Sequence, residues 1–174
     1  MEGLVSLREV RPSDLDRFFD LERDPIAARQ AAFTAKDPND RAAFDRHWQK
    51  ILADPSVLHR TVLHLGETVG YVAFFELLGP PSIAYWIDRR WWGQGIASRA
   101  LQLFLLEVDQ RPVHARVVRD NLASQHVLIH CGFVPVGTDH AYSDVRGEQV
   151  EEQIWRLDGV TRPGERPSPR PGDG

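Results

Sequence analysis

The amino-acid sequence predicts an α+β fold in which a mixed, mainly antiparallel sheet of about seven strands is flanked by about four helices. Short apolar or alternating segments recur along the chain, amphipathic segments of helical period interrupt them at uneven intervals, and no segment is repeated. A regular alternation of strands and helices would instead indicate a doubly wound parallel sheet. Because the chain has 174 residues, of which 42% are hydrophobic, one core is expected, and residues 1–157 are predicted to form a single domain.

The composition excludes several functional classes. The formal net charge of −4 does not indicate a nucleic-acid partner. The single cysteine, Cys131, excludes an internal disulfide and suits a reducing cytoplasm, which is the expected location. No apolar run approaches the roughly 20 residues that a membrane span needs, and the N-terminus lacks the core of a signal peptide. Neither a membrane partner nor export is therefore expected.

The first part of the chain predicts one strand followed by a helix. Residues 5–10 alternate between apolar and polar side chains, which is typical of a strand. Apolar residues then follow at helical spacing from Leu15, and Ser13 or Asp14 could cap that helix. The Asp24-Pro25 pair ends it, because the residue before proline disfavours the helical conformation.

A weaker pattern precedes the next clear helix. Residues 27–39 fit either a second short helix or an irregular crossing loop. Asp40 then caps a helix whose apolar face consists of Phe44, Trp48, Ile51 and Leu52.

Most of the predicted sheet follows. Residues 58–65 and 69–77 form a hairpin around Gly66-Glu67, and residues 82–88 form the strand after it. The later predicted elements are a helix at about 96–109, a strand at 113–118, a helix at 121–130 with Gly132 as its C-terminal cap, and strands at 133–142 and 150–157. Residues 158–174 are rich in Pro, Gly and Arg and are predicted to be a disordered tail.

A turn with two glycines connects the strand at 82–88 to an apolar helix. Gly93 and Gly95 let backbone N–H groups approach a ligand, and the helix start adds partial positive charge, so an anion site is expected here. A dinucleotide fingerprint does not fit, because Ser98 stands where its third glycine belongs, and the Gly-Lys-Ser or Gly-Lys-Thr of a Walker A loop is absent.

Two spaced motifs carry a resemblance to a known family. Arg90-x-x-Gly93-x-Gly95 resembles the acetyl-CoA pyrophosphate signature of the GNAT acyltransferases, and Asn121-Leu-Ala-Ser124 followed by Gly132-Phe133 matches a second block of that family. The order of predicted elements over residues 4–157 is also similar. The segment from Ala84 to Asp88 is most similar to the branch that acetylates the N-termini of ribosomal proteins, and that branch also contains enzymes acting on antibiotics and other small amines.

The resemblance implies acetyl-CoA as the cofactor, bound where parallel strands 82–88 and 113–118 splay apart. Backbone groups of residues 86–88 would pair with the pantetheine arm as if it were an added strand, and Ile87 would supply an oxyanion donor. N–H groups of residues 92–97, with the charge of Arg90, would bind the pyrophosphate. The implied cofactor residues are Trp86, Ile87, Asp88, Arg90, Trp92, Gly93, Gln94, Gly95, Ile96, Ala97, Ser98, Asn121 and Ser124. For Asn121, a simple helix N-cap is the alternative. No metal is implied.

The chemistry implied by the family is direct attack of a neutral amine on the thioester in a ternary complex. The usual acid for the leaving thiolate is a tyrosine at a position that is Leu128 here, so Ser124 is the candidate acid. The alternative for Ser124 is a hydroxyl bonded back to a helix carbonyl. The base stays open among Glu76, Tyr85, His114, Asp120 and His140.

The acceptor is expected to be a primary amine, with a protein N-terminus as the leading hypothesis. An antibiotic or polyamine is the alternative, and the missing tyrosine also leaves a non-catalytic acyl-CoA sensor open. Residues 25–40 and the hairpin at 138–149 are expected to select the acceptor, with acidic groups at Asp37, Asp139, Asp144 and Glu148. The sequence does not decide whether the protein forms a homodimer.

Overall fold

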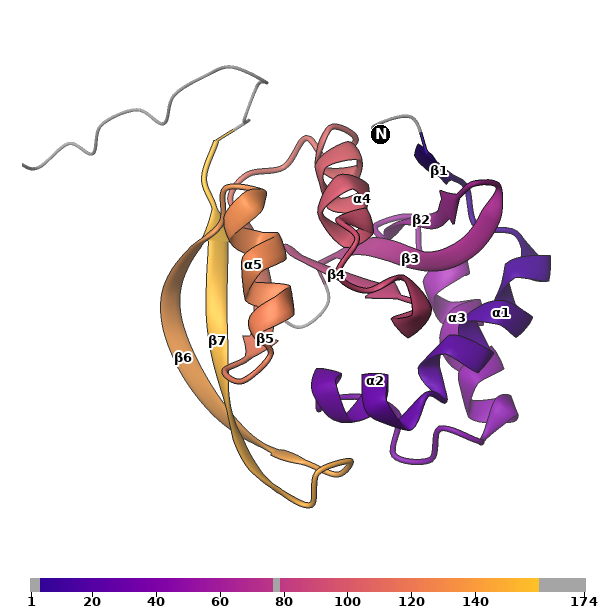
Figure 1. Cartoon of the computed structure of the whole chain (residues 1–174), viewed down its shortest axis with the longest axis horizontal. Coiled ribbons are helices and arrows are strands. Elements are labelled where there is room, and N and C mark those ends of the chain that lie inside the picture. Colours follow the sequence, from indigo (N-terminus) through magenta and orange to yellow (C-terminus); the bar gives the residue numbers. More distant parts are fainter. Residues whose placement is uncertain (1–3, 77–78, 160–174) are drawn as a thin grey trace, which may run out of the picture.

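The computed structural model describes residues 4–76 and 79–159 (Figure 1). A seven-stranded sheet has the order β1-β2-β3-β4-β5-β7-β6. Its strands are β1 (Val5–Arg8), β2 (Leu58–His64), β3 (Glu67–Phe75), β4 (Ser82–Ile87), β5 (Val113–Val118), β6 (Val134–Ser143) and β7 (Glu148–Leu157). Every neighbouring pair is antiparallel except β4 and β5, which are parallel. The predicted fold class is therefore confirmed.

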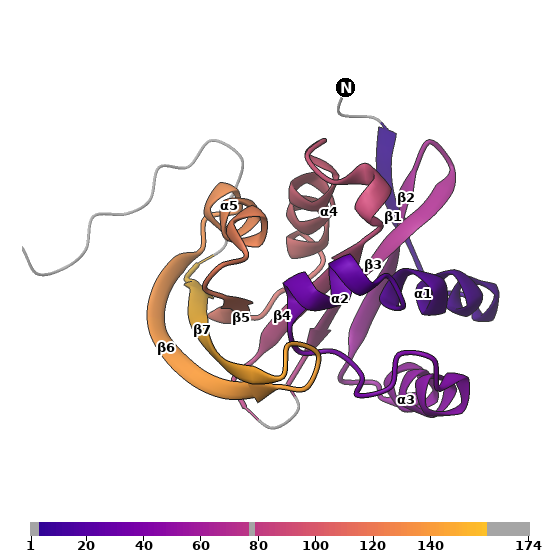
Figure 2. The ribbon, with the colours of Figure 1, turned by 60° about the horizontal axis from the view of Figure 1, so that its bottom comes forward.

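Helices cover both faces of the sheet (Figures 1 and 2). Within the described residues they are α1 (Leu15–Glu22), α2 (Pro25–Ala31), α3 (Arg41–Ala53), α4 (Ile96–Leu105) and α5 (Leu122–His130). The main core lies between the sheet and α4, and Leu101 and Phe104 are fully buried there. On the other face, Phe18 of α1 and Trp48 of α3 pack against Tyr71 of β3. No helix in this part of the chain is long and apolar enough to cross a membrane.

The strands β4 and β5 separate along their length, as expected. Their ladder contains one register pair, Ser82 with His114, and the N–H of His114 donates to the carbonyl of Pro81 at 2.8 Å. Beyond this point the β5-facing backbone of β4 has no strand partner. The sheet is thus split into four strands on one side of the gap and three on the other.

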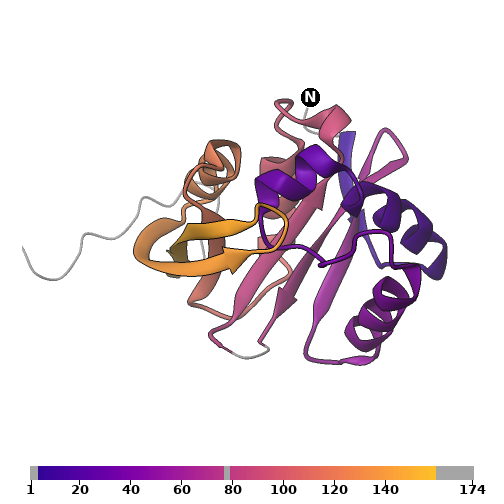
Figure 3. The ribbon, with the colours of Figure 1, turned by 90° about the horizontal axis from the view of Figure 1, so that it is seen from below.

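The segment of weak pattern contains a helix, α2, which crosses the sheet between α1 and the tip of the β6–β7 hairpin (Figure 3). Pro25 occupies its first turn, where a missing N–H costs nothing. The Asp24 side chain caps it by accepting from the N–H groups of Ile26 (2.9 Å) and Ala27 (3.2 Å). The Asp24-Pro25 pair, which was expected to end the first helix, therefore begins α2.

Two local predictions differ from the structure. Asp14 stands at the N-cap of α1, but its carboxylate instead binds Arg8 and Thr61, so it makes no cap hydrogen bond. Helix α4 ends at Leu105 rather than near residue 109, and the guanidinium of Arg111 binds the carbonyls of Leu105 and Val108. The expected tail falls almost entirely on residues 160–174, outside the described part of the chain.

Candidate active site

The predicted turn with two glycines connects β4 to α4. Gly93 and Gly95 have φ values of 74° and 76°, in the left-handed region that glycine adopts without strain. Gly95 is the N-cap of α4, and its carbonyl accepts from Arg99 N at 3.1 Å. The N–H groups of Ile96, Ala97 and Ser98 therefore precede the first intrahelical bond and have no acceptor within the helix. This arrangement is suited to binding an anion.

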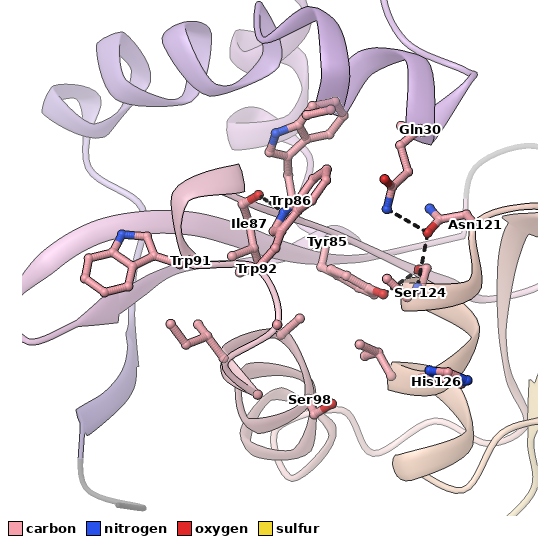
Figure 4. A pocket seen from close by; sticks show the side chains of 18 of the residues that line it. Gln30, Tyr85, Trp86, Ile87, Trp91, Trp92, Ser98, Asn121, Ser124 and His126 are labelled. Atoms are coloured by element: carbon pink, nitrogen blue, oxygen red, sulfur yellow. Dashed lines mark hydrogen bonds between the residues drawn. The ribbon is translucent and has the colours of Figure 1, made fainter.

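A cavity of about 420 Å³ opens beside this turn (Figure 4). Its walls come from β4, the turn, the start of α4, helix α5 and helix α2. The predicted cofactor residues among its lining are Trp86, Ile87, Trp92, Gly93, Gly95, Ile96, Ala97, Ser98, Asn121 and Ser124. Trp86, which also fits an ordinary core position, is half-buried and faces this cavity.

Only part of the β4 backbone faces the gap. The ladder pairs Trp86 with Tyr71, and the N–H of Asp88 donates to the carbonyl of Val69 at 2.8 Å. Because backbone groups alternate in direction along a strand, those of Trp86 and Asp88 point to β3, and those of Ile87 point to the gap. Of the three residues expected to pair with pantetheine, only Ile87 therefore presents its backbone N–H and C=O to the gap, and the expectation for Trp86 and Asp88 does not fit the geometry. Its carbonyl accepts from Trp92 Nε1 at 2.9 Å, which fixes the indole beside it.

The side chains of Asp88, Arg90 and Gln94 are not part of the cavity lining. Arg90 binds Asp88 (2.7 Å) and Glu67 (2.8 Å), so its charge is directed at two carboxylates rather than at the turn. Asp88 is buried and also pairs with Arg17. The expected role of Arg90 in binding pyrophosphate therefore has no support in the geometry, because Glu67 comes from a distant hairpin that local sequence did not connect with it.

Asn121 caps α5 and also faces the cavity. Its Oδ1 accepts from the backbone N–H of Ser124 (3.2 Å) and from Gln30 Nε2 (3.0 Å). A backbone N–H can only donate, so this contact identifies the oxygen and leaves Nδ2 available to a ligand carbonyl. A role of Asn121 as the N-cap of α5 is thus compatible with the expected contact to a cofactor. Gln30, which holds the amide from α2, was not found from the sequence because α2 has no clear pattern.

A hydrogen-bonded pair of hydroxyl groups lies at the inner end of the cavity. The phenol of Tyr85, on β4, is 2.5 Å from Ser124 Oγ, on α5. Burial raises the pKa of Tyr85 to about 12, and the hydrogen bond with Ser124 opposes that shift. A phenol with this pKa stays protonated near neutral pH, so it is suited to donate a proton and poorly suited to act as a base. Leu128, at the family's usual tyrosine position, is fully buried.

A second cavity, of about 640 Å³, adjoins the first. Its walls include α3, the segment 33–40 and strands β3, β4 and β5. Five residues line both cavities, which therefore meet at Ala31, Tyr85, Trp86, Asn121 and Ser124. The second cavity also contains Asp37, as expected for the acceptor side, and carboxylates that were not expected, at Glu22, Asp40 and Glu152.

The other candidate bases lie outside both linings. Glu76 follows the last residue of β3 and is exposed. Asp120 pairs with Arg146 at 2.6 Å, and His140 is an exposed residue of β6. His114 lies where β5 still pairs with β4, away from the open part of the gap.

Comparison with known proteins identifies the family. The profile of the acetyltransferase (GNAT) domain matches residues 5–134. A search of curated protein sequences finds no match.

Three similar solved structures illustrate the range of relatives. Mycobacterium smegmatis RimJ, in complex with CoA-disulfide, is 23% identical with a TM-score of 0.76, over 90% of this chain and 83% of that one. RimL, a ribosomal L7/L12 α-N-protein acetyltransferase in complex with coenzyme A, is 19% identical with a TM-score of 0.73, over 90% and 94%. Vibrio cholerae spermidine N-acetyltransferase, in complex with CoA and spermine, is 16% identical with a TM-score of 0.76, over 90% and 96%. Because the family profile covers most of the chain and the fold agrees, this protein belongs to the GNAT acetyltransferase family.

Proposed function

We propose that this protein transfers the acetyl group of acetyl-CoA to a primary amine by direct attack in a ternary complex. The observation that carries the proposal is the meeting of two cavities at Tyr85, Trp86, Asn121 and Ser124. One cavity is lined by the glycine turn and the start of a helix, which suits a phosphate-bearing cofactor. The other is lined by aromatic and acidic side chains, which suits an ammonium group.

The residues of the first cavity fit acetyl-CoA. The free N–H groups of Ile96, Ala97 and Ser98 would bind its pyrophosphate, and the gap-facing backbone of Ile87 would pair with an amide of its pantetheine arm. Asn121 Nδ2 would donate to a pantetheine carbonyl. When bound, acetyl-CoA supplies an activated acyl thioester whose carbonyl carbon accepts the amine.

The Tyr85–Ser124 pair would act at the leaving sulfur. The attacking nitrogen loses one proton before attack and a second as the C–S bond breaks, and the second is the one the thiolate gains. The two hydroxyl groups, 2.5 Å apart, form a short relay that can donate to sulfur and be reprotonated from nitrogen. Cys131 is not a nucleophile in this scheme, because burial raises its pKa to about 12.

A protein N-terminus is the leading acceptor, as for the neighbour RimL, an α-N-protein acetyltransferase. One observation favours the alternative of a compact small amine such as a polyamine. The tip of the β6–β7 hairpin contacts the end of α2, since Ser143 Oγ donates to the carbonyl of Ala32 at 2.5 Å and Arg146 Nε to that of Arg29 at 2.8 Å. These contacts join the hairpin to α2, whose last residue, Ala31, lines the acceptor cavity, and we expect this connection to hinder an extended peptide chain.

The test combines binding and turnover. Calorimetry is expected to show tight binding of acetyl-CoA and none of NAD or ATP. Release of free thiol is then measured with a hexapeptide bearing a free α-amino group and with spermine. Faster release with the peptide supports the leading acceptor, and faster release with spermine supports the alternative. Binding of acetyl-CoA without turnover of either amine would instead favour an acyl-CoA sensor.

A further inference from the structure

The acceptor cavity contains a carboxyl group without a cationic partner. Glu22 is the last residue of α1 and lines this cavity. Its Oε1 accepts a hydrogen bond from the phenol of Tyr71 at 2.6 Å. No arginine, lysine or histidine of the described residues forms an ion pair with Glu22, and burial raises its pKa while the Tyr71 hydrogen bond opposes that shift. A carboxylate in such a place is stabilised by a cation that enters the cavity.

The neighbouring ionisable groups differ from Glu22. Besides Tyr71, those that line the same cavity are Asp37, Asp40, His47, Tyr85, Arg116 and Glu152. Glu152 already has a counter-ion, because Arg116 Nη1 is 3.0 Å from its carboxylate. Asp40 caps α3 by accepting from Ala43 N, and Asp37 accepts from Asn39 N. Burial lowers the pKa of His47, which keeps that side chain neutral near pH 7. Among the described carboxylates of this lining, Glu22 is therefore the one that has neither an ion-pair partner nor a hydrogen bond from a backbone N–H.

Glu22 is connected through its partner to a residue that both cavities share. Its partner Tyr71 pairs with Trp86 across β3 and β4, so these two side chains lie on one face of the sheet. Trp86 lines both cavities. The phenol of Tyr71 thus holds the carboxyl group in the acceptor cavity, and the strand neighbour of Tyr71 is a residue that also lines the cofactor cavity.

We infer that Glu22 receives the ammonium group of the acceptor and takes its first proton, acting as the general base. This inference rests on the proposed function. In the step, an N–H bond of the ammonium breaks and its proton moves to the Glu22 carboxylate. The freed lone pair attacks the acetyl carbon, the C–S bond breaks, and the second proton reaches sulfur through Tyr85 and Ser124. Glu22 returns its proton to water after the amide leaves.

The environment makes this transfer feasible. In water an alkylammonium is a far weaker acid than a carboxylic acid, so the transfer is uphill. Burial raises the pKa of Glu22, and the same loss of water lowers the pKa of a bound ammonium. The two shifts act toward each other and reduce the cost of forming the neutral amine.

The decisive variant is Glu22→Gln, which keeps the size and can still accept from Tyr71. Its matched control is Asp20→Asn, which removes one negative charge from an exposed carboxylate of the same helix that lines neither cavity. Spermine or the hexapeptide, whichever the wild-type protein acetylates faster, is the acceptor. At pH 7, kcat/KM of Glu22→Gln is expected to fall about 100-fold, and that of the control less than threefold. The Kd for acetyl-CoA, measured by calorimetry, is expected to stay unchanged in both.

The pH profile separates a base from a structural residue. Above pH 10 much of the acceptor is neutral without help, so the defect of Glu22→Gln is expected to shrink at least tenfold from its value at pH 7. Tyr71→Phe, which removes only the phenol oxygen, is expected to show a smaller defect with the same dependence. A wild-type rate in Glu22→Gln, or a defect constant from pH 7 to pH 10, would overturn the inference while leaving the proposed function standing. Absence of turnover in the wild-type protein would overturn both.

Discussion

Ser124 combines two roles in one residue. Its backbone N–H is capped by Asn121, which fixes the first turn of α5, and its hydroxyl meets the phenol of Tyr85 from β4. The family's usual phenol would come from α5 itself, where this chain has the buried Leu128. In this chain the hydroxyl on α5, that of Ser124, is hydrogen-bonded to a phenol that a strand supplies.

The hydroxyl pair leads to the first prediction. Tyr85→Phe and Ser124→Ala are each expected to lower kcat at least tenfold, equivalent to about 1.4 kcal/mol, because each interrupts proton transfer to the leaving sulfur. The Kd for acetyl-CoA should change less than threefold, which calorimetry can check. Tyr142→Phe removes an exposed phenol on β6 and serves as the control. If Tyr85→Phe kept the full kcat, the relay would be excluded.

Gly70 carries the second prediction, because it lies where β3 approaches the cofactor strand. A Cβ at this position would stand 2.0 Å from the backbone oxygen of Trp86. Gly70→Ala must therefore displace β4, and a loss of about 1–3 kcal/mol in the free energy of unfolding is expected from this overpacking. Urea denaturation measures the loss. Gly79→Ala, whose added Cβ would meet no atom within 4 Å, should leave the midpoint nearly unchanged, and equal effects of the two changes would contradict the argument.

At the scale of elements, α2 forms part of both cavities but depends on its neighbours for its position. It has seven residues, and an isolated helix of that length is unstable in water. Arg146, at the tip of the β6–β7 hairpin, donates to the carbonyls of Arg29 and Gln30 and binds both carboxylate oxygens of Asp120. At the other end of α2, Arg89 binds Asp24 at 2.8 Å. These contacts hold the helix over the gap.

The third prediction concerns this attachment. Arg146→Ala is expected to raise the KM for the acceptor at least threefold and to speed amide exchange in residues 25–32, because the C-terminal end of α2 loses its anchor. Hydrogen–deuterium exchange with mass spectrometry measures the second effect. Arg156→Ala, which removes only an exposed pair with Asp158, should change neither quantity. Unaltered exchange in α2 would show that Arg146 does not hold it.

The elements that the sequence predicts well are those with strong local patterns. The positive φ of Gly93 and Gly95 follows from a tight strand-to-helix turn, and α4 follows from an apolar period. The widening gap between β4 and β5 was expected from the family resemblance. The local sequence pattern was thus enough to predict the turn and α4, whereas the gap in the sheet was predicted only through the family resemblance.

Side-chain partners from distant segments could not be predicted in the same way. Arg90 turns to Glu67, a residue of another hairpin, and Glu22 becomes part of a cavity only because Tyr71 holds it. The direction of the β4 backbone groups depends on the register with β3, and a shift by one residue reverses it. From the sequence, acidic groups that select the acceptor were expected in residues 25–40 and 138–149. The carboxylate on which the further inference rests, Glu22, lies instead at the end of α1.

At the scale of the whole molecule, the split sheet explains why the site lies where it does. The two groups of strands are joined through the single register pair of β4 and β5, and helices α2 and α5 border the gap between them. Ligands that fill this gap contact both groups. Binding of acetyl-CoA should therefore raise the stability of the whole fold, in proportion to the logarithm of its concentration above Kd.

The fourth prediction concerns acid stability, which depends on a buried ion pair at the start of the fold. Asp14 is buried and binds Arg8 of β1 at 2.7 Å and Thr61 of β2 at 2.8 Å. Burial alone would raise its pKa, but the hydrogen bonds from Arg8, the Arg11 N–H and Thr61 outweigh it and lower the pKa from 3.8 to about 2. A carboxylate with a lowered pKa stabilises the folded state above its unfolded pKa and loses that contribution as pH falls through its folded value.

Asp14 is therefore expected to contribute about 2 kcal/mol to the free energy of unfolding near neutral pH, a contribution that disappears as the pH falls from about 4 to about 2. Asp14→Asn should lose about this much at pH 7 and show a flatter decline of stability below pH 4, as followed by urea denaturation at a series of pH values. Asp16→Asn, which removes the charge of an exposed carboxylate on the adjacent helix, is the matched control and should keep the wild-type decline. Parallel declines in wild type and Asp14→Asn would assign the acid sensitivity to other carboxylates, because only a group whose pKa differs between the folded and unfolded states can change the slope.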